Sequence, residues 1–543
     1  MTKRLFIPLA FAILCSLQLK AQTVQVPMSW HMLDPIKDSV YGVSVNRAYS
    51  EILKGKTSKK VIVGIIDSGA DTLQEDLKDV LWRNPKEIQN DNKDNDQDGY
   101  VDDFYGWNFL GGKSDTSNVT DDTRESLRVY FAYKSLFENI TDSNKVPQKD
   151  RNKYNQWLRA KEIELTATPE AKEASSLERI ASLLPQISDF GSILVKDTFD
   201  IADVKAYEPI DRKTSAEKQI YTILLDKVTP GTTNITLPAA LDKLIDSLKK
   251  TSTLPDTPPP AYRARIVKDD YNNIKDKFYG NSNTAAGDVM HGTHVSGIIG
   301  AERNNNLGMD GIADNVSLME IRTVPSGGDE HDKDVALSIY YAVDHGAKVI
   351  NMSFGKPLSP NRSWVEDAIR YAAKKDVLLI HAAGNDGENL DSIPNYPTQF
   401  YGPNNSQAFD NVITVGASGA MKEDLVADFS NFGVKSVDVF APGVEIYSTL
   451  PGKDNYGALS GTSMASPVVT GVAAAIRSYY PELTAPQVKQ LIMASVTKID
   501  FPVMNPETGE AVKLSDLCIS GGIVNLYNAL KMLQDKQFPV NKK

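Results

Sequence analysis

The chain has 543 residues, a formal net charge of −11, 41% apolar and 24% charged residues, and two cysteines. These values are ordinary for a soluble protein of two or three domains, and they exclude a disordered or collagen-like chain. The acidic balance argues against a nucleic-acid partner, which would require a basic patch. Two cysteines in so long a chain exclude a disulfide scaffold.

Residues 1–21 have the pattern of a secretory signal peptide. Lys3 and Arg4 form a short positive segment, residues 5–19 are mostly apolar, and Ala21 is a small residue at the expected cleavage point. The pattern predicts an exported protein, either secreted or retained in a periplasm or at the cell surface.

Two other interpretations of this N-terminal segment are weaker. A membrane anchor needs about 20 apolar residues, whereas this run is shorter and Pro8 interrupts it. A lipoprotein signal at Cys15 is disfavoured because the bulky Leu14 precedes the cysteine and because Cys15 lies within the apolar run. No later stretch approaches the length of a membrane span, so we expect no membrane span in the mature chain.

Strand patterns alternate with helix patterns in the rest of the chain. Residues 61–66 form a continuous β-branched run, typical of a strand buried on both faces. Similar runs occur at 316–324, 347–354, 377–381, 412–415 and 437–440. Helical patterns lie between them at 291–299, 332–345, 364–374 and 465–479. This alternation predicts an α/β domain with a mostly parallel sheet, and functional residues at the carboxyl ends of its strands.

Residues 115–283 interrupt this α/β pattern. Charged and apolar residues mix there at helical spacing, for example at 215–227 and 237–249, and a proline-rich stretch ends the region. We therefore expect a mainly helical insert. The predicted division is a signal peptide, an N-terminal part of the α/β domain, the insert and a C-terminal part of the α/β domain, at residues 1–21, 22–114, 115–283 and 284–543.

Two motifs offer an acid and a base. Asp67-Ser68-Gly69 follows the strand at 61–66, where a carboxylate can orient a partner base, although alone it fits a plain turn. His291-Gly292-Thr293-His294 opens a glycine-containing helix, where a histidine can lie against a cleft. The H-E-x-x-H zinc pattern is absent, so we expect no catalytic metal.

A third motif offers a nucleophile. Ser463 lies within residues 461–467, where a helix rich in small residues begins. The free amides of a first helical turn would place a nucleophile beside an anion-stabilising donor. The simpler interpretation is an N-cap serine, which Ser466 before Pro467 fits equally well.

Taken together, these motifs resemble those of the subtilisin-like serine protease family, the subtilases. The order Asp, His, Ser and the stretches 63–71, 291–300 and 461–467 carry the resemblance, which covers about 30–115 and 285–530 and leaves the insert unmatched. It implies a subtilisin-like three-layer α/β fold around a central, mostly parallel sheet. It also implies an exported serine endopeptidase that hydrolyses protein or peptide substrates through an acyl-enzyme intermediate.

The resemblance also implies roles for four residues. Ser463 would attack the scissile carbonyl, His291 would accept and return the proton, and Asp67 would orient the imidazole. Asn385, within 382–387, would donate its amide to the oxyanion. A turn after a strand is the alternative interpretation of Asn385.

The same resemblance implies two walls that pair with the substrate backbone. These walls are formed by Ser353, Phe354 and Gly355 and by Ala382, Ala383 and Gly384. Asn395 would lie at the base of the primary pocket, where the family often has glycine, and would make the pocket shallower or more polar.

An acidic loop at residues 91–103 suggests a structural calcium site. Asp94, Asp96 and Asp98 with Gly99 match the first half of a calcium loop, but Tyr105 occupies the place of the bidentate glutamate of an EF-hand. The oxygens of Asp94, Asp96, Asp98, Asp102 and Asp103 are the candidate ligands. A solvated acidic turn is the alternative; the crowding of like charges favours Ca²⁺.

Two other functions remain open at the level of the sequence. A catalytically silent binding protein, such as a scaffold or a calcium-dependent adhesin, could use the same fold. A metallohydrolase is the more distant alternative. The complete set of Asp67, His291, Ser463 and Asn385 favours the enzyme.

Overall fold

The computed structural model describes residues 26–539, apart from 141, 188, 403 and 404. The predicted signal peptide, 1–21, lies outside the described residues. Within the described part of the chain, no helix combines the length and the apolar character needed to span a lipid bilayer.

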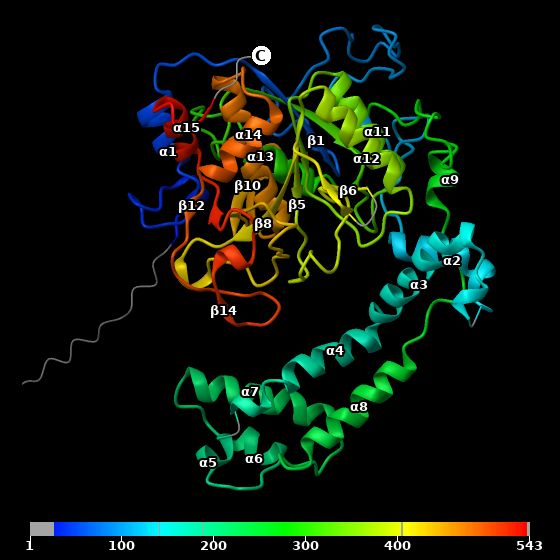
Figure 1. The fold of residues 1–543 in the computed structure, drawn as a ribbon, viewed down its shortest axis with the longest axis vertical. Helices are drawn as coiled ribbons and strands as arrows, with labels where there is room; N and C mark the ends of the chain where they lie inside the picture. Colours follow the sequence, from blue (N-terminus) through cyan, green and yellow to red (C-terminus); the bar gives the residue numbers. More distant parts are fainter. Residues whose placement is uncertain (1–25, 141, 188, 403–404, 540–543) are drawn as a thin grey trace, which may run out of the picture.

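A nine-stranded sheet forms the centre of the larger body, in the order β12-β15-β9-β8-β5-β4-β1-β3-β2 (Figure 1). In chain order its strands are β1 Val61–Asp67, β2 Gly106–Asn108, β3 Val316–Arg322, β4 Val349–Met352, β5 Leu378–Ala382, β8 Val412–Ser418, β9 Val439–Pro442, β12 Thr497–Lys498 and β15 Gly522–Ile523. Every neighbouring pair is parallel except β12 with β15. The predicted α/β fold with a mostly parallel sheet is confirmed.

Helices cover both faces of this sheet, because successive side chains of a strand point to opposite faces. Val63 and Ile65 of β1 belong to one core with α10 (Met290–Gly300), α13 (Thr462–Tyr479), α14 (Ala485–Ala494) and α15 (Leu526–Gln534). Ile66 belongs to the core on the other face, with α11 (Asp332–Asp344) and α12 (Arg362–Lys374). The two layers are visible in Figure 1, where α13 and α14 lie on the opposite side of the sheet from α11 and α12.

Residues between β2 and α10 form a set of helices, part of which projects from this body (Figure 1). The helices are α2 Glu125–Phe137, α3 Arg151–Thr166, α4 Pro169–Ala181, α5 Phe190–Leu194, α6 Ile201–Ala206, α7 Arg212–Lys227, α8 Leu237–Thr251 and α9 Tyr262–Ile266. The distal arm, α4 to α8, has its own core around Phe190, Leu224 and Leu237. The proximal helices α2 and α3 form a separate core that includes Leu358 of the α/β domain.

The two ends of this helical region are joined at the sheet edge. The backbone N–H of Asn108, the last residue of β2, donates to Asn281 O at 2.9 Å, and the N–H of Asn281 donates to Asn108 O at 3.1 Å. These bonds bring the two ends of the region together, while Phe109, Val119 and Tyr279 within it still belong to the core of the α/β body.

A buried ion-pair network attaches α2 to the α/β domain. Lys356 Nζ lies 2.8 Å from Glu125 Oε2 on α2 and 2.8 Å from Asp332 Oδ1 on α11, and all three side chains are almost fully buried. Burial alone would raise the pKa of Glu125, but the charges of Lys356 and Arg128 lower it below its ordinary value. Since Lys356 directly follows Gly355, this network ties the first helix of the insert to one of the expected substrate walls.

Substitution Glu125→Ala should lower the free energy of unfolding by about 3–5 kcal/mol, because it leaves buried cations without their carboxylate. Urea unfolding followed by circular dichroism measures this loss. The matched control is Glu178→Ala, which breaks an exposed pair with Lys249 on the arm and should cost about 0–1 kcal/mol. Equal losses in the two variants would contradict the proposed attachment.

Candidate active site

Asp67 and His291 meet at the carboxyl edge of the sheet. Asp67 is the last residue of β1, and His291 lies in the first turn of α10. Their side chains are joined by a hydrogen bond of 2.7 Å between His291 Nδ1 and Asp67 Oδ1. The Asp67 side chain is 2% exposed, whereas that of His291 is 37% exposed, so the imidazole bridges a buried carboxylate and the surface.

Two glycines allow this contact. A Cβ on Gly292 would lie 2.0 Å from Gly69 O, so α10 approaches the end of β1 as closely as backbone permits. The N–H of Gly292 also donates to Ser68 Oγ at 3.2 Å, and the N–H of Ser68 donates to Asp67 Oδ1 at 2.7 Å. The motif residues around Asp67 and His291 therefore fix the first turn of α10 against β1.

The environment of His291 favours its protonated form. Burial by itself lowers the pKa of His291, but the charge and the hydrogen bond of Asp67, with a smaller contribution from Asp288, raise it above its ordinary value. Asp67 thus stabilises an imidazolium at this position, which is the electrostatic role expected of the acid in a proton relay.

Ser463 lies in the first turn of α13, which packs against α10. Its Oγ donates to Ser353 O at 3.2 Å, and within the described residues no hydrogen bond joins it to His291. The structure therefore joins two of the three expected triad side chains directly. The contact between nucleophile and base is often long or misaligned in a free enzyme.

Asn351 at the end of β4 holds Ser353 and α13 together. Its Nδ2 donates to Ser353 Oγ at 2.9 Å, while its Oδ1 accepts from Ser466 Oγ and Thr470 Oγ1, each at 2.9 Å. The sequence analysis missed Asn351. A polar residue inside an apolar strand was the available signal, because buried polar groups require partners.

Asn385 follows β5 and is oriented by Thr462, the residue before Ser463. Its Oδ1 accepts from Thr462 N at 2.8 Å and from Thr462 Oγ1 at 2.9 Å. With the oxygen fixed in this way, the Nδ2 donor has no acceptor in the part of the chain that the structure describes. Asn385 is exposed, so this amide is available to an oxyanion beside Ser463.

The two expected substrate walls lie at the ends of the neighbouring strands β4 and β5, with Ala382 as the last residue of β5, and Asn395 lies between them. Asn395 Nδ2 donates to Ala383 O at 3.1 Å. A Cβ on Gly355 would lie 2.3 Å from the same nitrogen, and one on Gly384 would lie 3.2 Å from it. The Phe354 carbonyl accepts from His381 Nε2 at 2.8 Å. Both expected substrate walls therefore lie against the polar side chain of Asn395.

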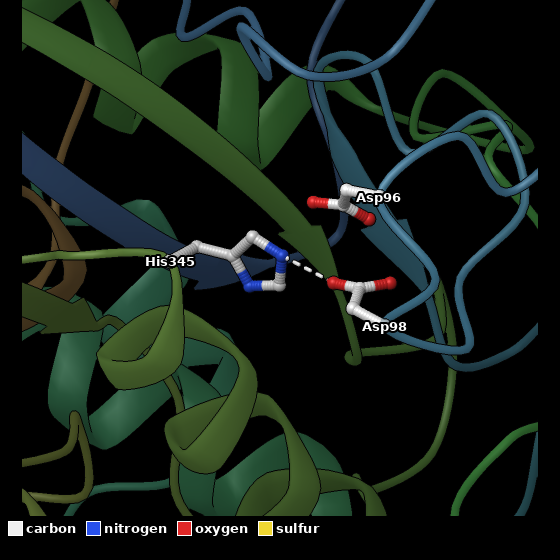
Figure 2. Close-up of side chains that lie close together, drawn as sticks. All are labelled: Asp96, Asp98 and His345. Carbon is white, nitrogen blue, oxygen red and sulfur yellow. Dashed lines mark hydrogen bonds and ion pairs between the residues drawn. The ribbon is translucent and has the colours of Figure 1, made fainter.

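Acids of the loop at 91–103 belong to two overlapping groups of side chains that could hold a metal ion. Glu87, Asp94 and Asp96 place one oxygen each within 4.8 Å of one another, and Asp96, Asp98 and His345 form the second group. Figure 2 shows the imidazole of His345 directed at Asp98, with Nε2 at 2.8 Å from Asp98 Oδ2. The sequence analysis missed Glu87 and His345, which lie outside the acidic run.

The first of these groups fits a hard cation, since all its donors are carboxylate oxygens. Glu87 Oε2 and Asp96 Oδ1 are buried without a hydrogen-bond partner among the described residues. Asp102 instead accepts from the N–H groups of Asp91 and Asn92, at 3.2 and 2.7 Å. The buried Asp103 side chain accepts from Asn84 Nδ2 and from the hydroxyl of Tyr341.

The sheet and its two helical layers agree with a subtilisin-like α/β fold. A model described as the subtilase family matches residues 58–511, which is most of the chain. The protein therefore belongs to the subtilase family.

Named relatives match shorter stretches. The chain is 42% identical over 188 residues to a thermophilic serine proteinase of Bacillus sp. (strain AK1), covering 35% of this chain and 42% of that protein. It is 35% identical over 300 residues to a cell wall-associated protease of Bacillus subtilis (strain 168), covering 55% and 28%. Subtilisin DY of Bacillus licheniformis is 38% identical over 210 residues, covering 38% and 71%. The match spans less than half the length of the first two relatives.

Substitution Asp67→Asn should lower the pKa of His291, because it removes the largest influence that raises it. A raised histidine pKa stabilises the fold below the ordinary value of 6.5, and this stabilisation is lost as the pH rises through the folded pKa. Compared with the unsubstituted protein, Asp67→Asn should therefore lose stability mainly below pH 6.5. NMR titration of the His291 ring measures the shift.

The matched control for this titration is Asp288→Asn, whose charge contributes less, so its shift should be smaller. A His291 ring that titrates at the same pH in Asp67→Asn and in the unsubstituted protein would contradict the electrostatic role of Asp67.

Proposed function

We propose that this chain is an exported serine endopeptidase that hydrolyses peptide bonds with Ser463, His291 and Asp67. The observation that carries the proposal is the 2.7 Å contact between His291 and Asp67, at the same sheet edge as the first turn of α13. Family membership and the serine proteinase and protease names of the relatives support it. The N-terminal pattern of residues 1–21 supports export.

In this mechanism Ser463 Oγ attacks the scissile carbonyl as His291 Nε2 accepts its proton. His291 Nδ1 remains bonded to Asp67, which holds the tautomer that leaves Nε2 free and stabilises the imidazolium. His291 then returns the proton to the leaving amine, and a water molecule repeats the sequence to release the acyl group. The Ser463 hydroxyl first has to turn from Ser353 O toward His291.

The negative charge that develops on the substrate carbonyl requires donors. The N–H of Ser463 at the start of α13 and Nδ2 of Asn385 are the two proposed donors. Thr462 fixes the Asn385 amide before the substrate binds, so little reorganisation accompanies the reaction. Loss of one such side-chain donor in a subtilisin costs about 2.7–4 kcal/mol of transition-state stabilisation.

We further propose that the substrate backbone pairs with the walls formed by 353–355 and 382–384, as an added strand. Asn395 then forms a polar floor between these walls. Its contacts with Ala383, Gly355 and Gly384 support a primary pocket that favours small or polar side chains over large apolar ones.

A fluorophosphonate probe tests the hydrolase assignment, since it labels only an activated serine. The unsubstituted protein should be labelled and should cleave a protein substrate. Ser463→Ala should abolish both properties, while Ser460→Ala, at an exposed serine just before the same helix, should retain labelling. A folded protein that resists the probe and cleaves nothing would instead favour a catalytically silent binding protein.

We also propose that the acidic loop binds a structural Ca²⁺ through Glu87, Asp94 and Asp96, with Asp98 alongside. The partnerless buried oxygens of Glu87 and Asp96 support this site. In the absence of a cation, burial raises the pKa of Glu87, and the neighbouring Asp96 and Asp94 raise it further. A bound cation would offset this repulsion among the three carboxylates.

Removal of calcium with a chelator should lower the midpoint of thermal unfolding, because a ligand at 100 times its Kd stabilises a fold by about 2.7 kcal/mol. Glu87→Gln should remove most of this calcium-dependent shift. Asp115→Asn, an exposed acid outside the loop, should leave it intact. The same midpoint with and without calcium in the unsubstituted protein would exclude the site.

A further inference from the structure

Glu320 is a buried acid on the strand next to Asp67. In the register of β1 and β3, Ile65 pairs with Glu320 and Asp67 pairs with Arg322, so Glu320 and Asp67 lie on the same face of the sheet. Glu320 is fully buried, and no basic side chain forms a salt bridge with it among the described residues.

The contacts of Ser296 indicate that the Glu320 carboxyl group carries a proton. Ser296 lies on α10, five residues beyond His291, and its Oγ is 2.8 Å from both Gly292 O and Glu320 Oε1. The hydroxyl has a single hydrogen, and Gly292 O can only accept. When Ser296 donates to Gly292 O, the second contact is satisfied only if Glu320 carries a proton and donates it to Ser296 Oγ.

The remaining oxygens of the two acids support this assignment. Glu320 Oε2 and Asp67 Oδ2 are both buried without a hydrogen-bond partner among the described residues. Two ionised carboxylates on one buried face, with no basic side chain of the described residues paired to either free oxygen, would be strongly unfavourable. A neutral Glu320 leaves Asp67 as the single anion on this face.

We propose that Glu320 is held as a neutral carboxylic acid behind the Asp67–His291 pair and acts as a positioning residue. It ties α10 to β3 through Ser296, and it leaves Asp67 as the single anion of this buried face that acts on His291. The effect of Glu320 on catalysis rests on the proposed function. The protonation of Glu320 and its bond to Ser296 do not.

The electrostatic surroundings of Glu320 agree with the proposal. Burial raises the pKa of Glu320, the hydrogen bond with Ser296 lowers it, and the negative charge of Asp67 raises it; together these influences raise the pKa to about 8. Asp67 is the only ionisable residue of β1, β2 has none, and α10 carries His291 and His294. On its own strand, Arg322 is two residues away and is bonded to Asn108 and Val119.

The first test compares Glu320→Gln with the unsubstituted protein. Glutamine is neutral at every pH and can donate to Ser296 as the protonated acid does. The unfolded chain releases this proton near the ordinary pKa of 4.5 while the folded chain keeps it, so the unsubstituted protein should lose stability as the pH rises toward 8. The melting midpoint of Glu320→Gln minus that of the unsubstituted protein should therefore increase as the pH rises from 4.5 to about 8, and it should stay constant above that pH. A constant difference from pH 5 to 9 would overturn the proposal.

The second test measures whether Glu320 acts on the triad. The proton in the His291–Asp67 hydrogen bond and the His291 ring are followed by NMR in a Ser463→Ala background. Both signals should show a second inflection near pH 8 that is missing in Glu320→Gln. Identical curves in the two proteins would show that Glu320 has no influence on His291. Neither test requires enzymatic activity. A negative result in either one can therefore be distinguished from a failure of fluorophosphonate labelling, which would count against the proposed function.

Ser296→Ala provides an independent variant if Glu320→Gln does not fold. Loss of the acceptor for the Glu320 proton destabilises the neutral acid, so the second inflection should move to lower pH. Movement to higher pH would show that Ser296 donates to an ionised Glu320, and it would overturn the proton assignment.

Discussion

The close approach of α10 to the end of β1 is the constraint on which the candidate site depends. Gly292 lies over Gly69 without room for a Cβ between them, and this contact brings an imidazole onto a buried carboxylate across 224 sequence positions. The same helix reaches β3 through Ser296. The geometry of His291 is thus set from two neighbouring strands, and a side chain at Gly292 would disturb both contacts.

Much of the α/β body could be predicted from the sequence, because strands buried on both faces are apolar without interruption. The run at 61–66 became β1, Val61–Asp67, and the pattern at 465–479 became most of α13, Thr462–Tyr479. The short edge strand β2, Gly106–Asn108, was not predicted, since three residues carry no periodicity. In the insert, α3 and α4 were missed because their apolar residues are few among many charged ones.

The site was less accessible to prediction than the fold. Motifs identified Asp67, His291 and Ser463, but not the side chains that hold them. Asn351 and Glu320 lie inside apolar strands, where their partners come from α13 and α10 and are invisible until the layers are packed. Glu87 precedes the acidic run and reaches Asp94 and Asp96 only because the loop folds back. These residues are recognised only from tertiary contacts, because the spacing of residues along the sequence does not show their partners.

The paired backbone bonds between Asn108 and Asn281 hold the two ends of the helical region together. They make residues 109–280 a loop whose ends are already closed, and the closure entropy of a loop grows by only about 0.6 kcal/mol for each doubling of its length. The length of the distal arm, α4 to α8, therefore has little effect on the α/β body. The proximal parts of the loop do matter, since Phe109 and Val119 belong to the core of that body and Glu125 pairs with Lys356. Segments of very different size could replace the distal arm, which has its own core, over evolution or by an engineer, with little change in the free energy of unfolding of the α/β body.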